Sequence, residues 1–170
     1  MGTGWDAGAW DGVAGEPDEW AWLEEWRARP HLDRIEEVGW AICTVPGDGF
    51  DLPYAYTVGL TRYHGHPELI VSGVDACGAM EYLDGLGARV RAGEQLRWGD
   101  TVTLGVERGV LLPVDQPERL EQAQLTYAPP GGPAVPALQL VVSDGAGRMP
   151  WEQGWSGWPQ VLYGTPRSAA

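Results

Sequence analysis

The chain has 170 residues, of which 44% are hydrophobic, and a formal net charge of -13. This length suits one domain with a buried core. All 11 basic residues are arginine. The charge excludes the basic surface expected of proteins that bind nucleic acid or anionic membranes. The absence of lysine excludes Schiff-base catalysis and pyridoxal phosphate anchoring, because both need an amine nucleophile.

Two further absences bear on location. The first 15 residues contain neither a basic region nor an apolar run, so no signal peptide is predicted. No stretch approaches the roughly 20 apolar residues of a membrane span. We therefore expect a cytoplasmic protein with Cys43 and Cys77 reduced, each acting as a small buried hydrophobe.

The N-terminal part of the chain predicts a flexible lead over residues 1–16, followed by a single domain over 17–170. A first helix is expected over residues 17–29. A second short helix is expected over 31–38, with Leu32 and Ile35 facing inward.

Alternating β-branched and aromatic residues with turn residues between them then predict three strands. They span residues 40–45, 53–60 and 68–73. A helix is expected over 74–93, with Asp75 as its N-cap. Its buried stripe should consist of Ala76, Met80, Leu83, Gly87 and Val90.

The second half predicts two strands over residues 100–107 and 110–114, joined by a tight turn at Arg108-Gly109. A helix over 117–127 and a last strand over 137–142 follow. Because the strands come in hairpin-like runs, we expect an α+β domain. Its sheet should have five or more strands, mostly antiparallel or mixed, with helices packed on one face.

Several segments resemble the bacterial family called domain of unknown function 4262. Residues 54–60 (Tyr-Ala-Tyr-Thr-Val-Gly-Leu) and 65–69 (Gly-His-Pro-Glu-Leu) carry the resemblance most clearly. We call these two segments the signature. It is flanked by similar residues at 39–40, 48–50, 138–141, 144–145 and 148–151. The similar region covers about residues 35–155. The resemblance implies a small α+β protein and brings no established catalytic residues.

Candidate chemistry concentrates in the signature. His66 has a pKa range suited to proton transfer, Glu68 would be its partner, and Tyr56 would donate a hydrogen bond to a carbonyl. Ordinary strand packing explains the tyrosines equally well, and a backbone-bonded turn is an alternative role for Glu68. Substrate-binding candidates come from the flanking aromatic and polar residues: Trp40, Tyr54, Thr57, Arg148 and Trp151.

A metal is not expected, because His64 and His66 flank a glycine in a turn and only His31 could join them. Nucleotide-binding and hydrolase motifs are missing from the sequence, so no cofactor is expected. Two functions stay open. The first is a cofactor-independent tailoring enzyme that uses acid/base chemistry on an apolar small molecule, by elimination, isomerisation, cyclisation or addition. The second is a non-enzymatic interaction or immunity-type module that binds a basic protein partner through exposed tryptophans.

Overall fold

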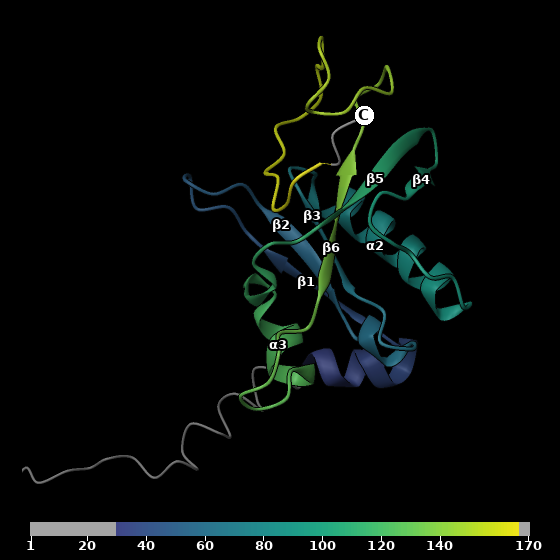
Figure 1. Cartoon of the computed structure of the whole chain (residues 1–170), viewed down its shortest axis with the longest axis vertical. Coiled ribbons are helices and arrows are strands. Elements are labelled where there is room, and N and C mark those ends of the chain that lie inside the picture. The colour runs from purple at the N-terminus through teal and green to yellow at the C-terminus, as the bar shows by residue number, and fades with distance from the viewer. Residues whose placement is uncertain (1–29, 167–170) are drawn as a thin grey trace, which may run out of the picture.

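The computed structural model describes residues 30–166, so the helix expected over 17–29 lies outside the described part. Six strands form one sheet in the order β1-β2-β3-β6-β5-β4 (Figure 1). All neighbouring strands are antiparallel except β3 and β6, which are parallel. The mostly antiparallel α+β prediction is confirmed. The strands are β1 (Ala41–Val45), β2 (Tyr54–Val58), β3 (Glu68–Ser72), β4 (Thr101–Leu104), β5 (Glu107–Pro113) and β6 (Ala137–Val142).

The turn between β4 and β5 lies three residues earlier than the sequence predicted. Gly105, with a φ of 65°, turns the chain together with Val106. Arg108 and Gly109 are instead paired residues inside β5. A Cβ on Gly109 would come within 2.5 Å of Leu140 Cδ1, so this glycine is needed for close strand packing and not for the turn.

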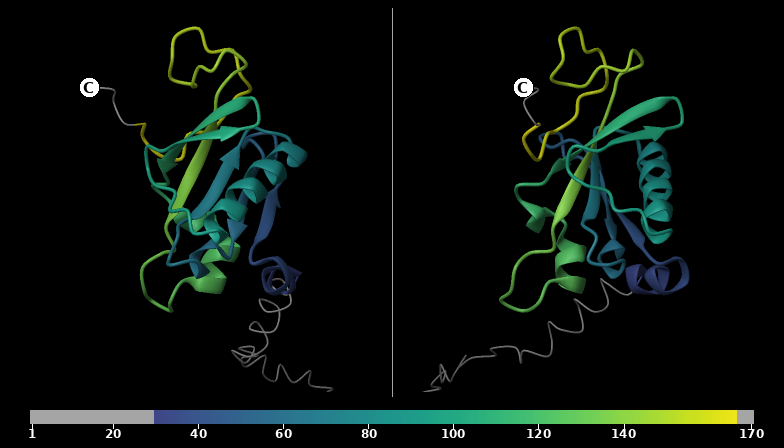
Figure 2. Two further views of the ribbon diagram at one scale, coloured as in Figure 1. Left: turned by 90° about the vertical axis from the view of Figure 1, so that its right-hand side faces the viewer. Right: turned by 45° about the vertical axis from the view of Figure 1, so that its right-hand side comes forward.

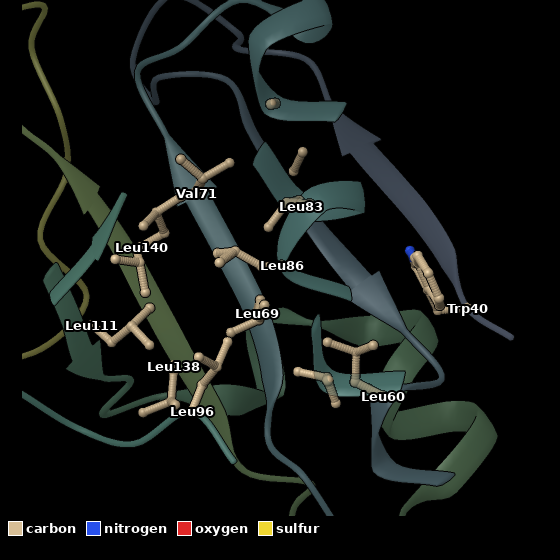
Figure 3. Packing of buried hydrophobic residues seen from close by; sticks show 14 of the residues in the cluster. Trp40, Leu60, Leu69, Val71, Leu83, Leu86, Leu96, Leu111, Leu138 and Leu140 are labelled. Carbon is tan, nitrogen blue, oxygen red and sulfur yellow. The ribbon is translucent and has the colours of Figure 1, made fainter. Parts of the chain in front are cut away.

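One face of the sheet packs against α2 (Ala76–Arg91), which crosses β1, β2 and β3. Figure 3 shows Leu83 and Leu86 of α2 against Leu69 and Val71 of β3. The predicted stripe was partly wrong, because Ala76 is exposed and Met80 is 48% exposed. The buried α2 residues are Ala79, Leu83, Leu86, Gly87 and Val90. Asp75 is the predicted N-cap and accepts the Gly78 N–H at 2.9 Å.

The opposite face is covered by α3 (Glu121–Tyr127), so helices lie on both faces and not on one (Figure 2). The helical residues 30–38 lie below the lower end of the sheet in these views. The predicted helix over 117–127 is divided into a 3-10 turn, η2 (Pro117–Arg119), and α3. Ile35 is buried in this second layer, as expected. Leu32 is 38% exposed, which corrects its predicted inward position.

After β6 the chain crosses this second face as an irregular segment, residues 156–165, which we call the C-terminal strap. Buried polar side chains of the sheet hold it. Gln139 donates to the Val161 carbonyl and accepts the Tyr163 N–H. The Ser72 hydroxyl bonds to both backbone groups of Val161 at 3.0 Å. These bonds replace the strand pairing that the strap lacks.

Among residues 30–166, none of the helices has the length and apolar character needed to cross a membrane.

Candidate functional site

Glu68, a predicted catalytic residue, begins β3 with its side chain completely buried. Its carboxylate accepts five hydrogen bonds of 2.6–3.2 Å from the segment that leaves β2. The donors are the backbone N–H groups of Gly59, Leu60 and Thr61 and the hydroxyls of Thr57 and Thr61. Burial raises the pKa of Glu68, and these hydrogen bonds oppose that rise because they stabilise the ionised form. The carboxylate therefore closes the 3-10 turn η1 (Leu60–Arg62) onto β3.

Thr57, a predicted substrate-binding residue, completes this network. Its hydroxyl donates to Glu68 at 2.6 Å and accepts the Leu69 N–H at 2.9 Å. The side chain is fully buried. Both hydrogen-bonding functions of the hydroxyl are thus used to fasten β2 to β3.

His66 is 1% exposed and bonds to two backbone groups. Its Nδ1 lies 2.6 Å from the Pro67 carbonyl oxygen, and its Nε2 accepts the Leu96 N–H at 3.1 Å. An acceptor Nε2 requires a neutral ring with its proton on Nδ1. Burial lowers the pKa of His66, consistent with that neutral form. His66 thus ties the start of β3 to the loop after α2, and both its nitrogens bond to groups other than Glu68.

Tyr56 and Tyr54 share one face of β2, as strand alternation predicted, and their rings stack at 6.2 Å. Tyr56 is 3% exposed, and its hydroxyl accepts the Gln122 N–H of α3 at 3.2 Å. Burial raises the pKa of Tyr56. Tyr54 is half-buried and also contacts Tyr163 and Arg119. The pair anchors α3 and the strap on the sheet.

The cysteines differ from each other. Cys43 is buried, with its sulfur 3.4 Å from Nε2 of His31, and burial raises the pKa of Cys43 to about 11. A thiol with that pKa stays protonated at neutral pH, so this contact is not a nucleophilic thiolate-imidazole pair. Cys77 is exposed, which corrects its expected burial.

Trp40 packs beneath α2. Its indole N–H donates to Asp84 at 3.0 Å, and the Arg91 guanidinium lies 5.4 Å from the ring centroid. A Cβ on Gly87 would come within 2.6 Å of the Trp40 ring, so the glycine permits this close approach. The predicted substrate-binding Trp40 is 4% exposed and packs in the core (Figure 3).

Arg148 and Trp151 belong to the loop after β6, which Asp144 organises. The Asp144 carboxylate accepts hydrogen bonds from the backbone of Ala146, Arg148 and Ser156 and from the Arg148 Nε at 3.0 Å. Burial would raise the pKa of Asp144, but these donors lower it to about 2. Arg148 therefore forms an ion pair with Asp144. Trp151 is 42% exposed.

The predicted site residues do not form one pocket. Glu68 pairs with Ala137 at the start of the parallel strands, whereas Arg148 and Trp151 follow the end of β6. A strand of this length spans about 15–20 Å, which separates the two groups. His66 and Trp151 therefore do not line a common pocket.

A cleft of about 880 Å³ lies instead at the carboxyl ends of β3 and β6, beside the N-terminus of α2. This is the end of the sheet where open sheets with parallel strands place their ligands. In Figure 1 the β1–β2 loop, the β4–β5 turn and the chain after β6 all lie toward the upper end of the sheet. Its apolar side chains are Leu52, Pro53, Val74, Val142, Trp158 and Pro159. Its polar side chains are Asp75, Tyr82, Glu107, Ser143, Asp144, Ser156 and Gln160.

The cleft wall contains a direct acid/base contact. Tyr82 of α2 donates its hydroxyl hydrogen bond to Glu107 Oε2, at the start of β5. Burial, and then this bond, raise the pKa of Tyr82, so the phenol remains a proton donor at neutral pH. Both side chains are half-buried, and both line the cleft. In the part of the chain that is described, no three His, Cys, Asp or Glu side chains gather as metal ligands.

The family model for domain of unknown function (DUF4262) matches residues 34–156. The chain belongs to this family. The match includes the signature, the whole sheet and the Asp144 loop, so the resemblance seen in the sequence is confirmed. Neither the comparison with curated proteins nor that with solved structures gives a match.

The family match also divides the cleft. Tyr82, Glu107 and Asp144 lie within the residues matched to domain of unknown function 4262, whereas Trp158 and Gln160 lie beyond them. Sequence reasoning missed this site because the cleft draws on short, separate segments of the chain. The sequence feature that could have pointed to the cleft was Asp75, which was correctly predicted as the N-cap of α2. The misplaced β4–β5 turn hid Glu107, which starts β5 instead of ending the strand predicted over residues 100–107.

Proposed function

We propose that this protein is a cofactor-independent acid/base enzyme that acts on an apolar small molecule in the cleft at the carboxyl ends of β3 and β6. The observation that carries the proposal is the Tyr82–Glu107 hydrogen bond on the wall of that cleft. A carboxylate and a phenol at one half-apolar site supply a base and a hydrogen-bond donor.

The chemistry consists of proton movement alone. Glu107 takes a proton from a carbon next to a substrate carbonyl, and the electron pair of the C–H bond passes to the carbonyl oxygen. Tyr82, freed from the carboxyl group that has gained the proton, donates its hydrogen bond to that oxygen. Glu107 then returns the proton to another atom of the substrate, which gives isomerisation without an oxidant or a reductant.

Hydrogen-deuterium exchange tests this proposal without knowledge of the natural substrate. The probe is 4-phenylbutan-2-one in D₂O, followed by proton NMR of the positions beside the carbonyl. The protein should accelerate exchange above the buffer rate, and Glu107→Gln should abolish the acceleration. Glu81→Gln is the matched control, because Glu81 is an exposed acid of α2 outside the cleft. Equal exchange rates with wild type and Glu107→Gln would contradict the role of Glu107.

A second candidate function, binding of a basic protein partner, is supported by the rim of the same cleft. Trp158 lines the cleft. Phe50 lies two residues before the lining residue Leu52, and Val106 lies directly before the lining residue Glu107. These three apolar side chains are 80%, 99% and 104% exposed, respectively. Exposed aromatic side chains beside carboxylates suit an amphipathic cationic peptide. Tight binding of a Leu-Lys peptide, with no exchange of the ketone probe, would favour this second function.

A further inference from the structure

We infer that the cleft selects ligands in which a positively charged amine is attached to a flat apolar group. The inference rests on the proposed function, since it names the substrate class of the same site. It is carried by the charges and the aromatic surface that line the cleft.

The charge of the cleft is one-sided. Asp75, Glu107 and Asp144 line it, and among the described lining residues none carries a positive charge. Two of these acids are already compensated. Asp144 is paired with Arg148 at 3.0 Å, and Asp75 caps the N-terminus of α2.

Glu107 is the acid whose charge is left uncompensated. Tyr82, which donates a hydrogen bond to Glu107, is a neutral group, so it leaves the negative charge of the Glu107 carboxylate in place. The N-terminal end of α2 carries about half a positive charge and would by itself attract an anion. Asp75 caps that end, so the helix does not present an uncapped positive end to an anion.

The aromatic surface is supplied by Trp158. Its side chain lines the cleft but is 80% exposed, so a ring face is open to a ligand. An indole ring stacks on flat apolar groups and attracts cations through its face. Gln160 holds this part of the C-terminal strap, because its side-chain amide bonds to both backbone groups of Val142 at 2.8–2.9 Å. The part of the strap that carries Trp158 is therefore fastened to β6.

Calorimetry with three matched probes tests the inference at low ionic strength. They are 2-phenylethylammonium, 2-phenylethanol and 3-phenylpropanoate, which share a phenyl ring and differ in charge. The ammonium probe should bind with a Kd on the order of 1 mM, as a ligand of this size allows. The anion should bind at least about tenfold more weakly, and added salt should weaken the binding of the ammonium probe.

Two substitutions locate the effect. Glu107→Gln should weaken binding of the ammonium probe by about tenfold, which is typical of a lost hydrogen bond to a charged group. Trp158→Ala should weaken it about two- to fivefold. Glu81→Gln removes the same charge from an exposed position of α2 outside the cleft and should leave the affinity unchanged.

The outcomes separate this inference from the proposed function. Binding of the alcohol or the anion as tightly as the amine would overturn the substrate class and leave the cleft as the site. Binding of none of the probes would overturn the inference as well. The acid/base proposal is tested separately, because the ketone used for deuterium exchange carries no charge.

Discussion

Two glutamates show how differently one residue type is used in this fold. Glu68 lies in the family signature, is completely buried and accepts five hydrogen bonds. Glu107 follows an exposed turn, lines a cleft and accepts a side-chain hydrogen bond from Tyr82. The first carboxylate holds β2 and β3 together and has no capacity left for a substrate. The second is positioned to exchange protons with a ligand. A recognisable motif can therefore be a folding element, and we propose that the reactive groups lie at the cleft.

The largest expected effect is that of Glu68→Ala on stability. It leaves buried donors of Gly59, Leu60 and Thr57 unsatisfied, so the free energy of unfolding should fall by about 3 kcal/mol or more. Urea denaturation measures this change. Glu81→Ala, at an exposed position of α2, should change it by less than about 0.5 kcal/mol. Similar losses for the two variants would refute the structural role of Glu68.

Gly73→Ala should destabilise the protein by about 2 kcal/mol. Gly73 has a φ of 73°, and a Cβ there would lie 2.0 Å from the Pro159 carbonyl oxygen. The strap must shift, so binding of the ammonium probe should weaken as well. Gly85→Ala is the matched control, because Gly85 lies within α2 with open space around its Cβ position. That variant should be equally or more stable than the wild type. An undisturbed thermal midpoint in Gly73→Ala would contradict the placement of the strap.

The pH dependence of stability should contain a contribution from His66. Burial lowers its pKa below the unfolded value of 6.5, so the unfolded state binds more protons as the pH falls below that value. Stability should then decrease on acidification, by at most about 1.4 kcal/mol per pH unit for this group. His31, whose pKa is also lowered by burial, acts in the same direction. Thermal unfolding between pH 5 and 8 should show a shallower slope for His66→Gln than for the wild type. His64→Gln, at an exposed position, should keep the wild-type slope, and an equal slope in His66→Gln would argue against a buried neutral ring.

The smallest expected effect on stability is at the cleft itself. Trp158→Ala should change the free energy of unfolding by less than about 0.5 kcal/mol, because the side chain is 80% exposed. The same substitution should weaken the binding of the ammonium probe. A large loss of stability would mean that Trp158 packs against the fold and does not serve a ligand.

The sequence predicted the fold better than the site, for a physical reason. Strand alternation and turn residues are local, and they located all six strands, with β6 correct at both ends. The predicted stripe of α2 was wrong at Ala76 and Met80, which are exposed, because small residues such as Ala79 could equally mark the buried side. The cleft depends on the parallel pairing of β3 and β6, a non-local contact that no spacing in the sequence encodes.

Local patterns also gave no indication that the signature acts as a folding element. His66 and Glu68 are two residues apart, which suggested a shared proton. In the fold they bond to different segments, His66 to the loop after α2 and Glu68 to the turn after β2. The C-terminal strap was missed because side-chain amides of Gln139 and Gln160 hold it instead of strand pairing.

The central claim is that ligands bind at the cleft and not at the signature. The most direct test is a titration of the ¹⁵N-labelled full chain with 2-phenylethylammonium, followed residue by residue through the backbone amide signals. The account predicts that the shifts concentrate at Val74, Asp75, Ser143 and Gly145, which line the cleft at the ends of β3 and β6. Shifts concentrated at residues 57–69, with the cleft amides unmoved, would contradict it.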